Sequence, residues 1–458
     1  MPGLSEQKAD IVRRLVETSP DRVVGALNAA LAGAGGDSAL SDVRRLVEAE
    51  TQDRRLRNLV LQPAAPLFRV QAGPHGFLAF PPKALAHLWR GLKQTRPDEI
   101  AALAAQLADK YAKEISADAL DELCLSAGEA LRAREPADFA LAAKLCDEAM
   151  PDGAELLAKC IDIVPVCRSV MPRLADWITR TTEASTAAAR LAYKDAVDIS
   201  EDAGVRFFEI LGAQLAHPWM VLRVISAVMD RPCESYFAGS EFAPFALQLM
   251  DEIDAGLQSL AQIDMAVGAS AGAAAAKRVE TISLQIHEIE ESIEVKPGGP
   301  WAPRLTAQKL ALAAKVEERL RAAQKATQAA LPTQSARVAR KLKQVPRLNV
   351  APDAEAVTEA RALLTFALEV RSSANHGGFA TSRGKLIETV GGMIDDHVEE
   401  TLAELRSGDP MDTAIALQHL EAAAELRLAM GDEKTAEVIR RRGAAAINGR
   451  PPAEEPAP

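Results

Sequence analysis

Apolar residues recur every third or fourth position along most of this chain, and that spacing places them on one face of an α-helix. The pattern is clearest in residues 245–345, where two long runs are joined by a segment rich in proline and glycine, residues 296–303. The seam positions are Met250, Ile253, Leu257, Leu260, Val279, Ile282, Ile286, Ile289 and Ile293 in the first run and Leu312, Val316, Leu320, Ala323 and Thr327 in the second. This spacing predicts a long antiparallel, coiled-coil-like helical hairpin.

Three features set the expected ends of the two helices. The prolines and glycines of residues 296–303 end the first helix, because proline cannot donate to the helical hydrogen-bond ladder and glycine frees the turn. The alanine-rich residues 269–276 shift the apolar register by about one position, which predicts a local change of supercoil within a continuous helix. Pro332 is expected to kink or break the second helix.

Charge supports the pairing of the two runs. The first run carries nine acidic and two basic residues, a net charge of −7, whereas residues 304–347 carry eleven basic and two acidic residues, a net charge of +9. Opposite charges on two helices that a short loop holds together favour their antiparallel docking and help to set its register. Each exposed pair contributes well under about 1 kcal/mol, so the apolar seam must hold the hairpin.

The rest of the chain also favours helices. Aromatic residues make up only 4% of the sequence, and no alternating run of β-branched residues flanked by turn signals indicates a strand. A chain of 458 residues exceeds one ordinary core, so two to four structural units are expected. The predicted fold class is all-α, a multi-helix array with a long helical hairpin and a C-terminal helical bundle. The expected parts are an N-terminal helical array (1–240), the hairpin (241–347), the bundle (348–443) and a disordered tail (444–458).

The sequence predicts a cytoplasmic protein without a membrane span. The most apolar tract, residues 205–228, contains Arg206, Glu209 and Arg223 and is interrupted by Pro218, so it is predicted to be a buried core. The N-terminus lacks the basic and apolar regions of a secretion signal. The five cysteines are odd in number and unpatterned, as expected of reduced thiols.

A cluster of basic residues near the end of the second run is the strongest candidate interaction surface. Its members are Arg337, Arg340, Lys341, Lys343 and Arg347. The cluster lacks the aromatic residues that stack on single-stranded nucleic acid and the bulky apolar face that inserts into a membrane. The acidic first run can also neutralise part of it within the chain. A structural role and a protein partner are therefore favoured over nucleic acid or lipid.

A glycine-rich loop, residues 376–384, is a second candidate site. It departs from a phosphate-binding P-loop, because Phe379 and Leu386 stand where the first glycine and the Ser or Thr are required, and no strand precedes it. The main interpretation is a flexible loop between helices. If the loop binds a ligand, Arg383 and Lys385 at the expected start of a helix suit an anion.

No motif for metal, cofactor or catalysis is found. None of the seven histidines follows an acidic residue at the spacing that di-iron bundles use, and no zinc-binding or nucleophile-elbow motif occurs. His397 lies among four acidic residues, which we interpret as a solvated acidic helix face. No cofactor and no catalytic residue are therefore predicted.

The leading functional hypothesis is a non-enzymatic scaffold or adaptor that binds protein partners through the hairpin and the helical array. Self-association through the apolar seam is an alternative use of the same surface. A nucleic-acid-associated regulator that uses residues 337–347 is a second hypothesis. A helical enzyme whose site lies in the glycine-rich loop is a third, since fold class alone does not reveal a site.

Overall fold

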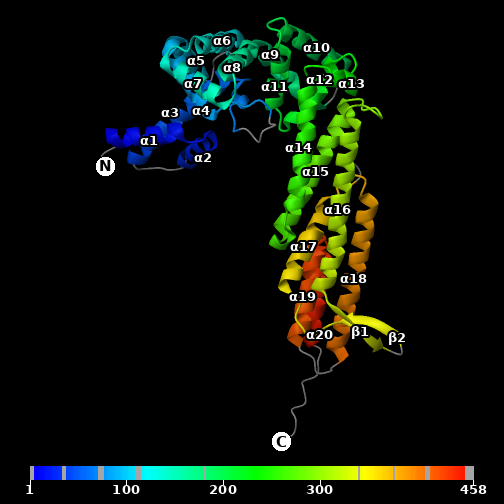
Figure 1. The fold of residues 1–458 in the computed structure, drawn as a ribbon. Helices are drawn as coiled ribbons and strands as arrows, with labels where there is room; N and C mark the ends of the chain where they lie inside the picture. Colours follow the sequence, from blue (N-terminus) through cyan, green and yellow to red (C-terminus); the bar gives the residue numbers. More distant parts are fainter. Residues whose placement is uncertain are drawn as a thin grey trace. The chain divides into compact units, whose positions relative to one another are not determined.

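The computed structural model describes residues 5–32, 38–70, 77–108, 115–179, 182–338, 341–374, 377–407 and 413–448. The described residues form α-helices connected by turns, three short 3₁₀ segments and one two-stranded antiparallel sheet, so the all-α class is confirmed (Figure 1). The chain divides into two compact units. Unit 1 comprises Met1–Pro232 and Ser240–Phe245, and unit 2 comprises Cys233–Gly239 and Ala246–Pro458.

Unit 1 is an array of short helices. They are α1 (Glu6–Thr18), α2 (Asp21–Ala32), α3 (Ser38–Leu61), η1 (Ala65–Leu67), α4 (Pro82–Thr95), α5 (Pro97–Ala108), α6 (Ala117–Ala133), α7 (Ala137–Ala149), α8 (Gly153–Asp162), α9 (Val164–Thr179), α10 (Glu183–Val197), α11 (Ala203–Ala213), η2 (Pro218–Met220) and α12 (Val221–Val228). Several helices begin at proline, which fixes a helical φ where no N–H partner is needed. Pro172 is an exception, since it lies inside α9.

Buried arginines connect these short helices. Arg54 of α3 is only 7% exposed, and it donates to the carbonyl oxygens of Val16 and Ser19 at the end of α1 and to the carboxylate of Asp21 at the start of α2. Arg168 of α9 similarly donates to carbonyls at the end of α3. The last carbonyls of a helix lack intrahelical partners, so an arginine satisfies them and fixes the neighbouring helix in place.

Unit 2 contains the longer helices and the sheet. Its elements are α13 (Glu234–Ala238), α14 (Ala243–Gln262), η3 (Met265–Val267), α15 (Ala269–Ser292), α16 (Ala302–Ala330), β1 (Thr333–Val338), β2 (Lys341–Pro346), α17 (Ala354–Glu369), α18 (Ala380–Ser407), α19 (Thr413–Ala429) and α20 (Glu433–Asn448). The first three residues of α14 belong to unit 1. From Ala246 onward, the hairpin and bundle segments that the sequence analysis separated at residue 347 both lie in unit 2.

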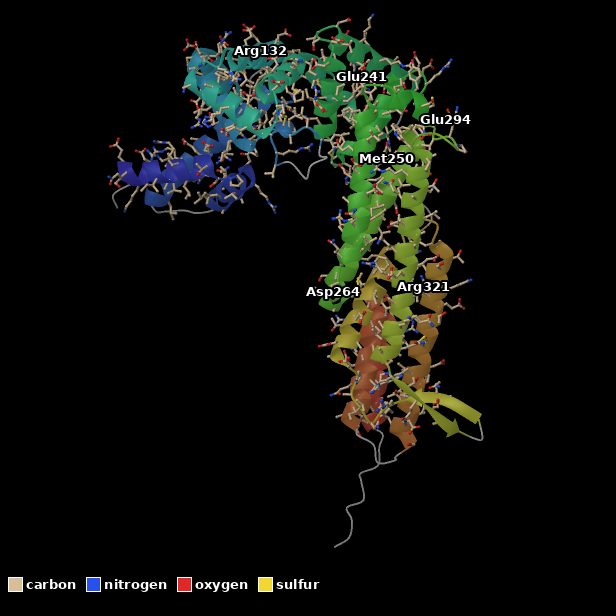
Figure 2. All side chains as sticks on the ribbon, in the orientation of Figure 1. Arg132, Glu241, Met250, Asp264, Glu294 and Arg321 are labelled. Carbon is tan, nitrogen blue, oxygen red and sulfur yellow. The ribbon has the colours of Figure 1, made fainter. Side chains whose placement is uncertain are left out.

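The first predicted arm is not one helix, which corrects the expected hairpin. The chain reverses between α14 and α15, and Figure 2 shows Asp264 at this reversal. Gly268 has φ of +107°, which side chains disfavour, and the Asp264 carboxylate accepts from the N–H of Ala266. The two helices run antiparallel, with Gln285 of α15 donating to Glu252 of α14 at 3.0 Å. The alanine-rich residues that follow therefore begin a new helix.

The predicted seam positions are buried, although the helices that cover them differ from those expected. Every predicted seam residue is less than 9% exposed. α15 and α16 pack against α17 more extensively than against each other. Contact between α15 and α17 is so close that a methyl group on Gly272 would lie 2.0 Å from the carbonyl oxygen of Ala362. The charge pairing is partly confirmed, because Arg304 of α16 binds Asp251 and Asp254 of α14.

The second helix ends just before Pro332, where a kink or break was expected, and a β-hairpin that was not expected follows it. α16 ends at Ala330, and β1 and β2 then pair antiparallel, with Thr333 opposite Pro346 and Arg337 opposite Leu342. Pro332 accounts for the end of the helix, since it cannot continue the ladder. The N–H of Arg347 donates to the carbonyl oxygen of Pro332 at 2.9 Å and closes the base of the hairpin. The prediction that the chain contains no strand was therefore wrong for this segment.

A buried carboxylate fixes the start of α16. Glu234 of α13 is 2% exposed, and its side chain accepts the N–H groups of Lys296, Trp301 and Ala302. These N–H groups belong to the preceding turn and to the first residues of the helix. A negative charge at a helix N-terminus is favourable because the unpaired N–H groups there carry partial positive charge.

Within the residues that the structure describes, no helix combines the length and the apolar character needed to cross a membrane.

Candidate functional site

A cavity of about 700 Å³ lies beside the β-hairpin in unit 2. It is lined by Thr327, Gln328 and Leu331 from the end of α16, by Thr333, Lys343, Gln344 and Pro346 from the hairpin, and by Met393, Asp396, His397 and Glu400 from α18. β2 packs directly against α18. The volume falls within the range of about 300–1,000 Å³ that small-molecule sites occupy, and the wall contains both apolar and polar residues.

Two buried histidines extend from this cavity into the bundle. His397 of α18 is 4% exposed and His419 of α19 is fully buried. Nε2 of His397 lies 3.1 Å from Nδ1 of His419, and Nε2 of His419 lies 2.9 Å from the carbonyl oxygen of Val350. The two rings stack with their centroids 5.2 Å apart.

The hydrogen bonds define which nitrogens carry protons. A carbonyl oxygen only accepts, so Nε2 of His419 must be the donor to Val350. In a neutral ring Nδ1 of His419 is then an acceptor, and Nε2 of His397 must donate to it. Nδ1 of His397 is left as a bare acceptor, and it has no hydrogen-bond partner among the described residues. Nδ1 of His397 is therefore an unused acceptor that is itself buried from solvent.

Burial explains why both rings are neutral. Removal from water, with a smaller contribution from the neighbouring His419, lowers the pKa of His397 to about 3. Burial also lowers the pKa of His419, although the Val350 carbonyl opposes this shift. The neutral forms agree with the proton positions that the hydrogen bonds require.

The low pKa of His397 predicts loss of stability in acid. The unfolded ring has a pKa near 6.5, so the stabilisation is complete above that pH and is lost as pH falls from 6.5 toward the folded value of about 3. In that window, His397 is expected to increase the slope of the unfolding free energy against pH by at most about 1.4 kcal/mol per pH unit. Urea denaturation between pH 7.5 and pH 4.5, followed by circular dichroism, measures this slope for the wild type and for His397→Gln.

Lys343, Asp396 and Glu400 line the same cavity and are common to both proteins. The difference between wild type and His397→Gln therefore isolates the histidine. Equal slopes in the two proteins would contradict the buried, neutral assignment.

The charged groups of the cavity do not balance. Lys343 forms an ion pair with Glu400, and both side chains are partly exposed. Asp396 adds a second carboxylate to the lining, while His397 is neutral. The wall therefore carries two negative charges and one positive charge.

The predicted basic cluster lies in and around the hairpin. Lys343 lines the cavity, and Arg347 is exposed at the base of the hairpin. The structure places Arg337 in β1 and Lys341 in β2, and Arg340 lies outside the described residues.

The predicted anion site does not bring its two basic residues together. α18 begins at Ala380 rather than at Lys385, and Arg383 donates to the carbonyl oxygens of Ala367 and Leu368 at the end of α17. Lys385 instead lines a smaller cavity of about 250 Å³ with residues of α16. Arg383 thus fixes the end of a helix, and His376 of the predicted loop lies outside the described residues.

The sequence analysis placed His397 on a solvated acidic face, and this was wrong because the ring is buried. A signal was present in the sequence. His397 stands between Ile394 and Thr401, at steps of three and four, and all three residues are buried on the core side of α18. Asp396 and Glu400 flank this seam and carry the acidic character of the segment. The contact with His419 depends on the register between α18 and α19, for which the sequence gives no signal.

Among the described residues, no group of three or more histidine, cysteine or acidic side chains is placed to hold a metal ion. Comparison of the chain with protein-family models, with curated proteins and with solved structures found no match.

Proposed function

We propose that this protein is a non-enzymatic scaffold or adaptor whose docking segment is the β1–β2 hairpin. The observation that carries the proposal is a two-stranded sheet that projects from the side of a helical bundle (Figure 1). Neither strand pairs with a third strand within the described part of the chain. The outer edge of such a strand offers N–H and C=O groups to an extended segment of another protein, which then adds a strand to the sheet.

The charge of the hairpin indicates the chemistry of the partner. Residues 333–347 contain five basic residues and no acidic residue, in a chain whose net charge is −11. An extended acidic segment of a protein matches both the charge and the strand edge. A nucleic acid is less favoured, since residues 333–347 contain no aromatic side chain for base stacking.

A labelled peptide of alternating glutamate and valine tests this proposal by fluorescence anisotropy with the full-length protein. We expect binding that weakens with salt and an affinity at least about tenfold lower for the triple variant Arg337→Glu, Arg340→Glu and Lys341→Glu, because charge reversal replaces attraction by repulsion. A matched control reverses Arg13, Arg45 and Lys144, which lie on exposed helix faces of unit 1. That control should bind like the wild type.

Two further measurements separate strand addition from simple charge attraction. A peptide with the same side chains and N-methyl groups on alternate amides cannot pair with a strand edge, so its binding should be lost. Equal binding of the methylated peptide would contradict strand addition. Tighter binding of a 20-base-pair DNA duplex than of the acidic peptide would replace the protein partner by nucleic acid.

A further inference from the structure

A long groove lies between α3 and α5 in unit 1. We propose that this α3–α5 groove binds an amphipathic helix of a partner protein, whose apolar side chains fill the groove and whose acidic residue pairs with Arg55. This inference does not depend on the docking role proposed for the hairpin.

The α3–α5 groove consists of two neighbouring cavities. One of about 880 Å³ is bounded mainly by α3 and α5, and one of about 540 Å³ is bounded by α3, η1 and the start of α4. Arg55 and Leu107 line both cavities, so the two are adjacent parts of one groove. Its α3 wall extends from Ala49 to Gln62, which gives a length of about 20 Å at a rise of 1.5 Å per residue. That length matches about four turns of a bound helix.

The apolar face of α5 is only partly covered within unit 1. α5 buries only Ile100 and Leu103, and from Ile100 to Ala108 its one polar side chain is Gln106. Its five alanines are all exposed, namely Ala101, Ala102, Ala104, Ala105 and Ala108. A helix face that remains in water normally carries charged and polar side chains. An exposed apolar face beside an open groove therefore indicates a surface that a partner covers.

The side chains of the groove suit a row of larger apolar residues from a helix. Ala49, Ala101 and Ala104 line the larger cavity with Leu56, and Leu59 and Phe68 line the smaller one. Small side chains leave room in which leucine or phenylalanine side chains of a bound helix can lie. Residues at positions i, i+3 or i+4 and i+7 of an amphipathic helix form such a row.

Arg55 determines the charge expected of the partner. The two carboxylates in the groove wall already have basic partners, since Arg54 binds Asp21 and Lys93 binds Asp53. Arg55 is exposed, and its side chain forms no ion pair or hydrogen bond with any described residue. The charge left over in the groove is therefore positive, and an acidic residue on the bound helix complements it.

A polar rim extends along the same wall of the groove. Gln52, Arg55, Asn58 and Gln62 follow one another at steps of three or four residues, so they lie on one face of α3. An apolar centre bordered by polar side chains is the usual anatomy of a protein interface. The rim places Arg55 near the middle of the bound helix rather than at one end.

A long-chain carboxylic acid has a similar combination of charge and apolar surface, but the groove favours a helix. Small-molecule sites enclose most of the surface of their ligand. Here Ala101, Ala104 and Ala108 of the lining are exposed, so an acyl chain in the groove would remain partly in water. A helix needs only one of its faces covered, and its polar face then remains in water.

The test begins with a library of displayed peptides of about 16 residues, selected on the full-length protein. The recovered peptides are then labelled, and their affinities are measured by fluorescence anisotropy. We expect them to share apolar residues at positions i, i+3 or i+4 and i+7, with an acidic residue at the border of that apolar face. Circular dichroism should show that they gain helix on binding.

Two pairs of variants locate the binding. Ala104→Trp fills the groove, and we expect it to weaken binding at least tenfold. Ala102→Trp is its matched control, since Ala102 is exposed on α5 and lines neither cavity. Arg55→Glu should also weaken binding at least tenfold, whereas Arg45→Glu alters an exposed residue of α3 outside the groove and should change it less than twofold.

A charge exchange tests the contact with Arg55 directly. A peptide whose acidic residue is replaced by lysine should bind Arg55→Glu more tightly than it binds the wild type, because the exchange restores an opposite pair. Arg55 is exposed, so this measurement holds even if Ala104→Trp disturbs α5.

The proposal is overturned if no helical peptide is recovered, if Ala104→Trp and Ala102→Trp weaken binding equally, or if the charge exchange has no effect. Binding of a fluorescent long-chain fatty acid that Ala104→Trp abolishes, without peptide binding, would assign the groove to a lipid instead. A dimer in sedimentation that Ala104→Trp dissociates would assign it to a second copy of the chain. Either result replaces the helical partner.

Discussion

Replacing Gly272 by alanine is expected to destabilise unit 2 by about 3 kcal/mol. The added methyl group would lie 2.0 Å from the carbonyl oxygen of Ala362 and 3.1 Å from the backbone nitrogen of Phe366. These are backbone atoms of α17, so no side-chain rotation relieves the clash, and α15 and α17 must move apart. Alanine gains only about 1 kcal/mol of helix propensity over glycine, which is too little to offset the lost packing.

Gly392→Ala provides the matched control for that measurement. Gly392 lies inside α18, it is exposed, and an added methyl group would meet no atom within 4 Å. This variant should therefore gain roughly 0.5–1 kcal/mol from helix propensity alone. Urea denaturation followed by circular dichroism compares the two variants with the wild type. A gain in stability for Gly272→Ala similar to that of the control would show that α15 and α17 do not pack this closely.

Replacing Glu234 by alanine is expected to cost about 3–5 kcal/mol. The carboxylate accepts three backbone N–H groups, from Lys296, Trp301 and Ala302, while the side chain is 2% exposed. Its removal leaves these donors without their acceptor at a largely buried site and takes a negative charge from the start of α16. Glu234→Gln keeps one acceptor oxygen but turns an NH₂ group toward a backbone donor, so its cost should fall between the wild type and alanine.

Glu294→Ala is the control for this prediction, because Glu294 lies close to the same turn but its side chain is exposed. Surface substitutions of this kind usually change stability by less than about 0.5 kcal/mol. Thermal and urea unfolding of Glu234→Ala, Glu234→Gln and Glu294→Ala give the comparison. If Glu234→Ala costs no more than Glu294→Ala, the carboxylate does not hold the start of α16.

Helical periodicity was a reliable guide to burial. Positions such as Ile253, Val279 and Leu320 were predicted to lie in a seam, and all are buried. This succeeded because the three-four spacing of apolar residues depends only on the geometry of a single helix. It does not specify which neighbour covers the seam, and the cover supplied by α17 was missed for that reason.

The two errors in the hairpin have a common physical cause. The reversal at Gly268 and the β-hairpin after Pro332 each occupy few residues, and local turn chemistry decides both. The alanine-rich residues after Gly268 favour a helix, so the sequence analysis predicted a continuous helix there. The positive φ of Gly268 permits the break that the structure shows. The segment around Arg337 was interpreted only as a basic cluster. Its β-branched residues Thr333 and Val345 suit strands, but they were not used to predict one.

Only part of the candidate site could be predicted from the sequence. Lys343 belonged to the predicted basic cluster and lines the cavity. His397 was noticed for its acidic neighbours, and its position in the seam of α18 was overlooked. The pairing of His397 with His419, and of His419 with Val350, joins three segments that are distant in sequence. Such contacts depend on tertiary packing and have no local signature.

The position of α17 also has a consequence for the order in which unit 2 can form. The ribosome synthesises α15 and α16 before residues 354–369, and α17 packs extensively against both helices. Until α17 emerges, the faces of α15 and α16 that pack against it have no cover in the nascent chain. Surfaces of this kind are what chaperones bind during translation, and they aggregate when left exposed. Unit 2 is therefore completed from its C-terminal side. A ribosome that stalls before residue 354 leaves an incomplete chain that is prone to aggregate.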